Sequence, residues 1–177
     1  MAKSNDLAPI IAGCRQGDAE CFSRLVDTYA GRCHGYFYRL TGDKDISDDL
    51  LSELFLRLVE KISSYRGGSF EGWVFRIASN IFHDYLRAKQ RQKKLLEKEQ
   101  NEPLIEETDA GKYDSSEKMD RVQMLLNRLD EDTRELIMLR FYSQLSFKEI
   151  AVMRSEPIGT TLSKLHRGLK RLRESME

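Results

Sequence analysis

The sequence predicts an all-α protein built from two helical domains that an acidic, flexible linker joins. Apolar residues recur at helical spacing through most of the 177 residues, and only three prolines interrupt them. No stretch shows the alternating pattern of a half-buried strand. Residues 96–117 hold eight acidic and two basic side chains with no sustained apolar period, which is typical of a linker. We therefore expect a first domain over residues 1–95, the linker over 96–117, and a second domain, a helix-turn-helix, over 118–177.

Three helices are expected in the first domain. Asp18 is a candidate N-cap for the first helix, which Gly42 ends. Its predicted buried stripe comprises Phe22, Leu25, Val26, Tyr29, Cys33, Phe37 and Leu40. Ser47 is expected to begin the second helix, whose buried stripe comprises Leu50, Leu51, Leu54, Phe55, Leu58, Val59 and Ile62. A Gly-Gly loop follows, and Ser69 is expected to cap a third, long helix from about Phe70 to near Lys94.

The second domain shows four shorter helical segments. The first has an apolar stripe of Met119, Val122, Leu125, Leu126 and Leu129, and either Asp132 or Thr133 is expected to cap the next, which runs through Phe141. Ser146 and Glu149 have the spacing of a capping box. A turn over 154–156 follows, and Pro157 suits the first position of the last helix.

The last helix has one apolar and one basic side. On a helical wheel the predicted buried side comprises Ile158, Leu162, Leu165, Leu169, Leu172 and Met176, and the opposite side comprises Thr160, Ser163, Lys164, Arg167, Lys170 and Arg171. A short capped helix, a tight turn and such a helix indicate a helix-turn-helix, whose second helix enters the major groove of DNA. Arginine can read a guanine with two hydrogen bonds, whereas lysines suit phosphates. The alternative is that basic residues merely favour a helix C-terminus, but residues 164–173 hold five of them and His166 without an acid.

The long helix of the first domain carries a second polar stripe beside many aromatic residues. The stripe comprises Arg76, Asn80, His83, Arg87, Arg91 and Lys94, spaced by three or four positions. Basic groups beside aromatic rings suit single-stranded nucleic acid, because bases stack on rings and phosphates meet cations. The aromatic residues, Trp73 among them, would equally fit a core. From the residues alone, both interpretations stay open.

The sequence lacks the motifs that are typical of an enzyme active site or a metal site. It contains no phosphate-binding loop, zinc-protease motif, nucleophile elbow or dinucleotide fingerprint, so we expect no catalytic activity, no cofactor and no bound metal. Cys14, Cys21 and Cys33 lack metal-ligand spacing and are expected to be reduced, partly buried thiols. His34, His83 and His166 have no obvious carboxylate partners along the chain. Without an export signal or a membrane span, the expected location is the cytoplasm.

Several segments, taken together, resemble the bacterial RNA polymerase sigma factors. They are Tyr38-Arg-Leu-Thr-Gly-Asp, Asp49-Leu-Leu-Ser-Glu-Leu-Phe, Phe70-Glu-Gly-Trp-Val-Phe-Arg-Ile-Ala-Ser-Asn, Glu149-Ile-Ala, Pro157-Ile-Gly-Thr and Leu165-His-Arg. The similarity is to the small extracytoplasmic-function class, which keeps two of the conserved domains. It covers nearly all of the chain outside the linker, with both blocks in the right order.

The resemblance implies a subunit that directs RNA polymerase to specific promoters and initiates transcription. Asp49, Glu53 and Arg57 would then dock on the clamp of the largest polymerase subunit. The helix and loop from Tyr65 to Asn80 would read and melt the minus-ten element, and the last helix would read the minus-thirty-five element as a duplex. With the two polar stripes, the candidate DNA-binding residues are Tyr65, Trp73, Arg76, Asn80, His83, Arg87, Thr160, Thr161, Ser163, Lys164, His166, Arg167, Lys170 and Arg171. An anti-sigma factor is a further candidate partner.

The chain departs from the family pattern at three places. Ser52 stands where the family usually has Gln in the docking helix. Ser155 replaces the usual glycine of the helix-turn-helix turn, where a left-handed residue would strain serine more than glycine. Leu162 stands where a basic residue is common, and its place on the wheel indicates a core residue or, at most, a contact with a thymine methyl group.

Two other functions remain as alternatives. A stand-alone helix-turn-helix regulator with an N-terminal sensory domain would bind duplex DNA tightly on its own, usually as a dimer. An anti-activator that binds only proteins would leave both basic stripes without a use. A sigma factor would bind DNA weakly alone and specifically with polymerase.

Overall fold

The computed structural model describes residues 7–100 and 117–176, with side chains over 7–97 and 121–176, and every regular element in these ranges is a helix. The first domain contains α1 (Leu7–Arg15), α2 (Ala19–Thr41), α3 (Lys44–Lys61), the 3₁₀ turn η1 (Ile62–Ser64) and α4 (Phe70–Gln100). The second contains α5 (Glu117–Asn127), α6 (Glu131–Tyr142), α7 (Phe147–Arg154) and α8 (Ile158–Glu174). The predicted all-α fold with two helical domains is confirmed.

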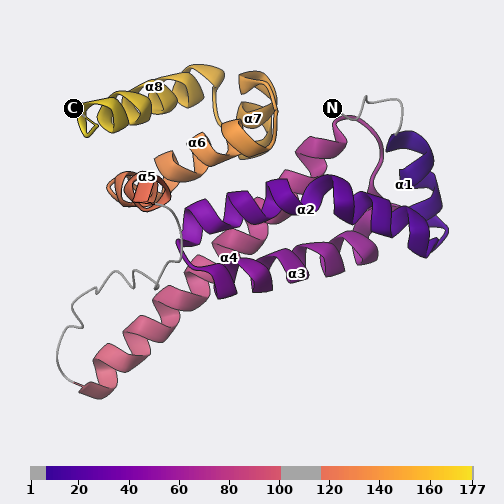
Figure 1. The fold of residues 1–177 in the computed structure, drawn as a ribbon, viewed down its shortest axis with the longest axis horizontal. Helices are drawn as coiled ribbons and strands as arrows, with labels where there is room; N and C mark the ends of the chain where they lie inside the picture. The colour runs from indigo at the N-terminus through magenta and orange to yellow at the C-terminus, as the bar shows by residue number, and fades with distance from the viewer. Residues whose placement is uncertain (1–6, 101–116, 177) are drawn as a thin grey trace.

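In the first domain, α2, α3 and the first half of α4 pack side by side, and α4 continues beyond them (Figure 1). The predicted ends of α2 are confirmed, because the Asp18 carboxylate accepts hydrogen bonds from two backbone N–H groups and Gly42 is left-handed with φ 72°. The predicted start of α3 is wrong. Asp43 caps it by accepting from Ile46 N at 2.9 Å, while Ser47 is buried inside the first turns. Because a carboxylate four residues earlier caps the helix, the N–H groups that Ser47 was expected to cap lie inside α3, where backbone carbonyl oxygens accept from them.

Two further features of the first domain differ from the prediction. Helix α1 was not expected, yet it buries Leu7, Ile11 and Cys14 against the domain. Val59 was placed in the core, but it is 52% exposed, because the apolar stripe of α3 is wider than the face that α2 and α4 cover.

Cys33 is also buried and Cys21 is partly buried, and all three cysteines are free thiols, as expected.

The second domain begins its helices with strong caps. Asp130 caps α6 by accepting from Thr133 N at 2.9 Å, so the expected caps at 132 or 133 are wrong by two or three positions. The capping box is confirmed, because Ser146 and Glu149 exchange both hydrogen bonds. Pro157 lies one position before α8 as its N-cap. Among the predicted stripe residues of α5, Val122 is exposed, and the side chain of Met119 lies outside the described residues.

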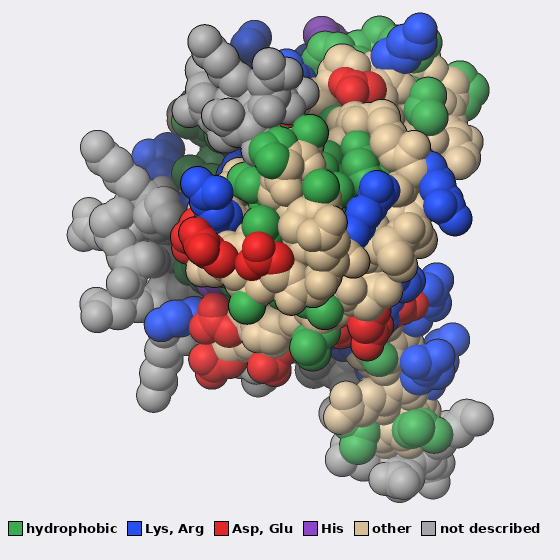
Figure 2. Space-filling view, turned by 90° about the vertical axis from the view of Figure 1, so that its right-hand side faces the viewer, with side chains coloured by type: hydrophobic (Ala, Val, Ile, Leu, Met, Phe, Trp, Pro, Cys, Tyr) green, Lys and Arg blue, Asp and Glu red, His purple; other side chains and the backbone are tan. Residues whose placement is uncertain are grey.

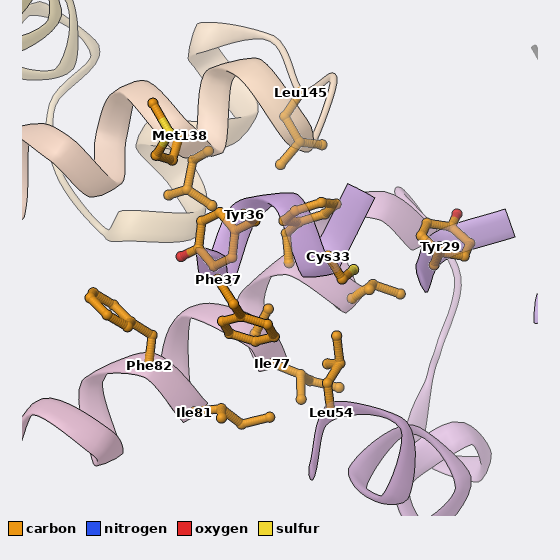
Figure 3. Packing of buried hydrophobic residues seen from close by; sticks show 14 of the residues in the cluster. Tyr29, Cys33, Tyr36, Phe37, Leu54, Ile77, Ile81, Phe82, Met138 and Leu145 are labelled. Carbon is orange, nitrogen blue, oxygen red and sulfur yellow. The ribbon is translucent and has the colours of Figure 1, made fainter. Parts of the chain in front are cut away.

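The two domains pack against each other along α2 and α6 (Figure 1). Met138 and Leu145 point from the second domain toward the α2 segment that carries Tyr36 (Figure 3). One continuous cluster of buried apolar residues therefore extends through both domains. Helix α4 runs to Gln100, beyond its predicted end near Lys94. Most of the expected linker, residues 101–116, lies outside the described residues, so its flexibility and the boundaries at 95 and 118 stay predictions.

Candidate nucleic-acid interface

The last helix, α8, presents a polar face with most of the predicted DNA contacts. Ser163, His166, Arg167, Lys170 and Arg171 are exposed, and Thr160 is half-buried. The Arg167 Nε donates to the carbonyl oxygen of Ser163 at 3.3 Å, so its guanidinium group lies along the helix toward the N-terminal turns. Those turns are the ones that reach base edges in a helix-turn-helix.

The buried side of α8 differs from the helical wheel. Thr161, Leu165 and Gly168 are the buried residues, while Ile158, Leu162, Leu169 and Met176 are all exposed. Thr161 was a candidate DNA contact and is fully buried, and Leu162, 41% exposed, does not belong to the core. Gly168 explains the rotation, since an added Cβ there would lie 2.5 Å from Thr133 Cγ2 and 3.0 Å from Ile137 Cδ1. The missing side chain lets α8 approach α6 along this line.

We expect opposite effects of alanine at the two glycines of α8. Alanine favours a helix over glycine by about 1 kcal/mol, so Gly159→Ala, where a Cβ meets nothing within 4 Å, should stabilise the protein. Gly168→Ala adds an overpacking cost of about 1–3 kcal/mol that outweighs this gain. Urea denaturation of both variants measures the difference. Equal stabilisation by the two substitutions would show that α8 does not need the close approach to α6.

The start of α8 is held by an ionic cluster that continues into the turn before it. Lys164 Nζ lies 2.8 Å from Asp132 Oδ2 and 2.9 Å from Glu156 Oε2, and these two carboxylates raise the pKa of Lys164. Thr161 Oγ1 donates to Glu156 Oε1 at 2.8 Å. Glu156 also lies 3.3 Å from Arg154 Nε. Lys164, a predicted phosphate contact, is therefore partly neutralised by its neighbours in this arrangement.

The turn between α7 and α8 adopts the strained conformation that the sequence suggested. Ser155 has φ 55° and ψ 38°, in the left-handed region. Its N–H donates to carbonyl oxygens of α7, which satisfies the end of that helix. The helix-turn-helix thus forms with serine where a glycine would be unstrained.

A cleft opens beside the Gly-Gly loop of the first domain. It has a volume of about 950 Å³ and its lining includes α1, residues 65–71 and Glu149 of α7. Tyr65 was a candidate DNA contact, but it is buried and its hydroxyl donates to Gly68 O at 2.7 Å. Its ring packs edge-on against Phe70 and tilted against Trp73. Tyr65 therefore shapes the loop, and Trp73, half-buried, shares that aromatic cluster.

The polar stripe of α4 is exposed, and two of its residues pair with carboxylates. Arg76 and Asn80 are exposed, as the DNA-binding interpretation requires. His83 Nε2 lies 3.1 Å from Glu135 Oε2 of α6, and Arg87 pairs with Asp84 on its own helix. Hydrogen bonding to Glu135 raises the pKa of His83 against the opposing effect of burial.

The predicted polymerase-docking face lies on α3. Asp49 is exposed, and Arg57 Nη2 lies 2.5 Å from Glu53 Oε1 and 3.5 Å from Asp84 Oδ2. Leu56 on the same helix is exposed, in agreement with its absence from the predicted buried stripe. At the end of the molecule shown in Figure 2, acidic, basic and apolar side chains are interspersed, so that end is not a single basic patch.

The expectation that the histidines lack carboxylate partners is wrong for two of them. His34 Nε2 lies 3.2 Å from Asp48 Oδ1, and His83 contacts Glu135. Glu135 itself was missed, together with its donors Tyr36 and Ser79. These partners stand 52 to 99 positions from Glu135 in sequence, so no local pattern could pair them. The one available signal was that Glu135 directly precedes the apolar run of α6 over residues 136–139.

Among the described residues, no cluster of three or more metal-binding side chains occurs, and no described helix is long and apolar enough to span a membrane.

The sequence matches two protein families. Residues 25–92 match Sigma-70 region 2, and residues 119–172 match Sigma-70, region 4. The ECF RNA polymerase sigma factor SigE of Mycolicibacterium smegmatis is 31% identical over 86% of this chain, which spans 60% of that relative's length. The ECF RNA polymerase sigma-E factor of Haemophilus influenzae is 29% identical, with 100% of this chain and 98% of the relative aligned. SigW of Bacillus subtilis is 28% identical over 92% of each chain.

Solved structures share the fold. The sigma factor RpoE of Bartonella quintana, in complex with the anti-sigma factor NepR, superposes with a TM-score of 0.73 at 24% identity, covering 86% of this chain and 94% of that one. CnrH, in complex with the cytosolic domain of CnrY, gives 0.69 at 19% identity and covers 94% of each chain. These two structures show the shared fold. The two family matches, in their expected order, and the sequence relatives identify the chain as a member of the sigma-70 family, a sigma factor of the extracytoplasmic-function (ECF) class, whose members are DNA-binding subunits of RNA polymerase.

Proposed function

We propose that region 4 of this chain, residues 119–172, reads the duplex minus-thirty-five element through α8. The observation that carries the proposal is the exposed face of α8, where Ser163, Arg167 and Lys170 project on the side opposite the buried Leu165 and Gly168. Arg167 has the chemistry for a guanine edge, and Lys170 and Arg171 suit the phosphates beyond it.

Region 2, residues 25–92, is proposed to read and open the minus-ten element. The Gly-Gly loop borders the cleft described above, and Arg76 and Asn80 are exposed on the adjoining turns of α4. An open cleft beside cations and aromatic rings suits an unstacked single strand. Trp73 and Tyr65 act in this proposal by holding the loop, since Tyr65 is buried.

We further propose that the chain is not itself catalytic, that it works with polymerase in the cytoplasm, and that an anti-sigma factor binds it. The two similar solved structures, those of RpoE and CnrH, are both complexes with a partner protein. The partner of RpoE is an anti-sigma factor.

Reconstitution with core RNA polymerase tests the proposal. The complete chain plus core enzyme should form open complexes on a set of promoter fragments, whereas the chain alone should bind the same duplexes weakly. Tight, palindrome-dependent binding by the chain alone, unaffected by polymerase, would favour the stand-alone regulator.

Removing two carboxylates from α3 should weaken the association with core polymerase. Asp49→Ala combined with Glu53→Ala deletes charges worth up to about 1 kcal/mol each at an exposed site, so we expect a loss of affinity of about tenfold with unchanged helicity. Titration of labelled core enzyme measures it. The control combines Glu20→Ala with Asp27→Ala, two exposed carboxylates of α2. An affinity that stays at the wild-type value would show that polymerase docks elsewhere.

A further inference from the structure

The Gly-Gly loop takes its position from the residue that begins it. Gly67 and Gly68 have φ values of 101° and 89°, which glycine adopts without strain. A Cβ added at either glycine would meet nothing within 4 Å, so packing does not fix the loop there. Tyr65 donates from its hydroxyl to Gly68 O at 2.7 Å. The position of Tyr65 therefore determines where the two glycines lie.

Arg15, in the last turn of α1, contacts the backbone that leads into this loop. Its Nη2 donates to the carbonyl oxygen of Tyr65, and its Nε donates to that of Ile62, in η1, at 3.5 Å. The Arg15 Cζ also lies 5.9 Å from the centroid of the Tyr65 ring. A guanidinium group can reach two carbonyl oxygens because its donors form a planar fork, which the ammonium group of lysine does not provide. One side chain of α1 thus contacts both ends of the segment 62–65.

The packing of α1 on α2 fixes Arg15 in turn. The buried face of α1 comprises Leu7, Ile11 and Cys14. A Cβ added at Gly13 would lie 3.0 Å from Cys21 Cβ and closer still to its Sγ, so the last turn of α1 lies directly against α2. Asp18 N donates to Gly13 O at 3.1 Å, and this bond joins the end of α1 to the N-cap of α2. Helix α1 also packs beside η1 (Figure 1).

An aromatic cluster links Tyr65 to the exposed residues of α4. The centroid of the Tyr65 ring lies 5.1 Å from that of Phe70 and 5.5 Å from that of Trp73. Trp73 stands three positions before Arg76, which is exposed. A shift of Tyr65 would therefore move the loop and disturb the first turns of α4 together. Helix α1 lies before residues 25–92, the part of the chain that matches region 2.

We propose that Arg15 is a positioning residue for minus-ten recognition. By fixing the carbonyl groups of Ile62 and Tyr65, it keeps the Gly-Gly loop and the start of α4 in the arrangement that discriminates between bases. Arg15 acts through the loop and contacts no base itself. Reading of the minus-ten element by this loop rests on the proposed role of region 2, whereas the contact of Arg15 with the loop does not.

The fluorescence of Trp73 reports the loop in the complete chain without DNA, because Trp73 is the one tryptophan of the sequence. Arg15→Gln removes the fork, so Tyr65 should shield the indole less and quenching by acrylamide should rise. Arg15→Lys should act in the same direction. Arg24→Gln, which removes an exposed arginine of α2, is the control and should be quenched like the wild type. Equal quenching of Arg15→Gln and the wild type, with unchanged circular dichroism, would overturn the contact.

Transcription by the reconstituted polymerase tests the effect on promoter recognition. Arg15→Gln and Arg15→Lys should both lower the discrimination among single-base minus-ten variants by about threefold or more, and leave that among minus-thirty-five variants unchanged. Because Arg15 is exposed, the rival role is a direct contact with a DNA phosphate. Such a contact would weaken all promoters alike, and lysine would replace it. Full recovery in Arg15→Lys would therefore overturn the positioning role.

Two variants of α4 distinguish a failure of this proposal from a failure of the proposed role of region 2. Arg76→Ala and Asn80→Ala change exposed residues of the α4 stripe directly. A loss of minus-ten discrimination in these two variants, with wild-type discrimination in both Arg15 variants, would overturn the positioning role and leave the role of region 2 intact. Higher quenching in Arg15→Gln, with wild-type discrimination in all four variants, would overturn the role of region 2 and leave Arg15 as a contact that only shapes the loop.

Discussion

Replacing Arg154 by alanine is expected to lower the free energy of unfolding by about 3–5 kcal/mol, because it leaves buried carboxylates without their cation. The Arg154 guanidinium group is largely buried and lies 3.0 Å from Glu135 and 3.3 Å from Glu156. It also pairs with Asp132. Without it, Glu135 keeps donors only from region 2, and Glu156 keeps Lys164 and Thr161. The turn of the helix-turn-helix and the contact between the regions both lose their shared cation.

Urea denaturation of the complete chain, followed by circular dichroism, measures this loss. Arg154→Lys keeps the charge but not the planar fork that reaches three carboxylates, so an intermediate loss is expected. Lys148→Ala, an exposed cation on the same helix α7, should change the stability by no more than about 0.5 kcal/mol. A loss below about 1 kcal/mol for Arg154→Ala would mean that water replaces the guanidinium group without cost.

Local signals in the sequence predicted most of the helices. Asp18, Gly42 and the Ser146–Glu149 capping box all act as expected, because a cap depends on residues within one turn of it. The predicted N-caps at Ser47 and at 132–133 were wrong because an aspartate a few positions earlier, at 43 and 130, caps each helix instead. Two cap-forming residues close together leave the start of a helix ambiguous by a few positions.

The orientation of α8 was the larger error, and it has a packing origin. Its leucines follow a regular helical period, which predicted one buried arc. The structure instead buries Thr161, Leu165 and Gly168, since the absence of a side chain at Gly168 allows the closest approach to α6. A glycine contributes nothing to an apolar period, so the wheel could not indicate that it faces a neighbouring helix. As a result Thr161 was predicted as a DNA contact and Leu162 as core.

Contacts between segments that lie far apart in the chain could not be predicted from the sequence. The exposed residues of the candidate site, such as Arg76 and Arg167, could be identified from charge and spacing. The pairing of His83 with Glu135 could not, because the two residues stand 52 positions apart and meet only through the packing of α4 against α6. The sequence thus identified the residues that face solvent, while the structure shows that His83, itself 47% exposed, pairs with a carboxylate of the opposite region.

Base reading and phosphate binding by α8 should respond differently to mutation. Arg167→Ala should relax the preference at one position of the minus-thirty-five element by about 1–3 kcal/mol, since an arginine that reads a guanine discriminates by that amount. Arg167 is exposed near the middle of α8, with Ser163 one turn before it. Lys170 lies farther along the same face and pairs loosely with Glu174 at 3.7 Å. Lys170→Ala should therefore weaken all sequences alike and reduce the salt slope of binding by about one unit.

Transcription by the reconstituted polymerase across single-base promoter variants, at fixed salt, separates these two roles. Arg173→Ala, an exposed cation in the last turn of α8, is the control for simple loss of charge. Equal losses on every promoter variant for Arg167→Ala would make Arg167 a backbone contact. Wild-type activity of both Arg167→Ala and Lys170→Ala would mean that the basic face of α8 is only solvated, and that region 4 binds promoter DNA through another surface.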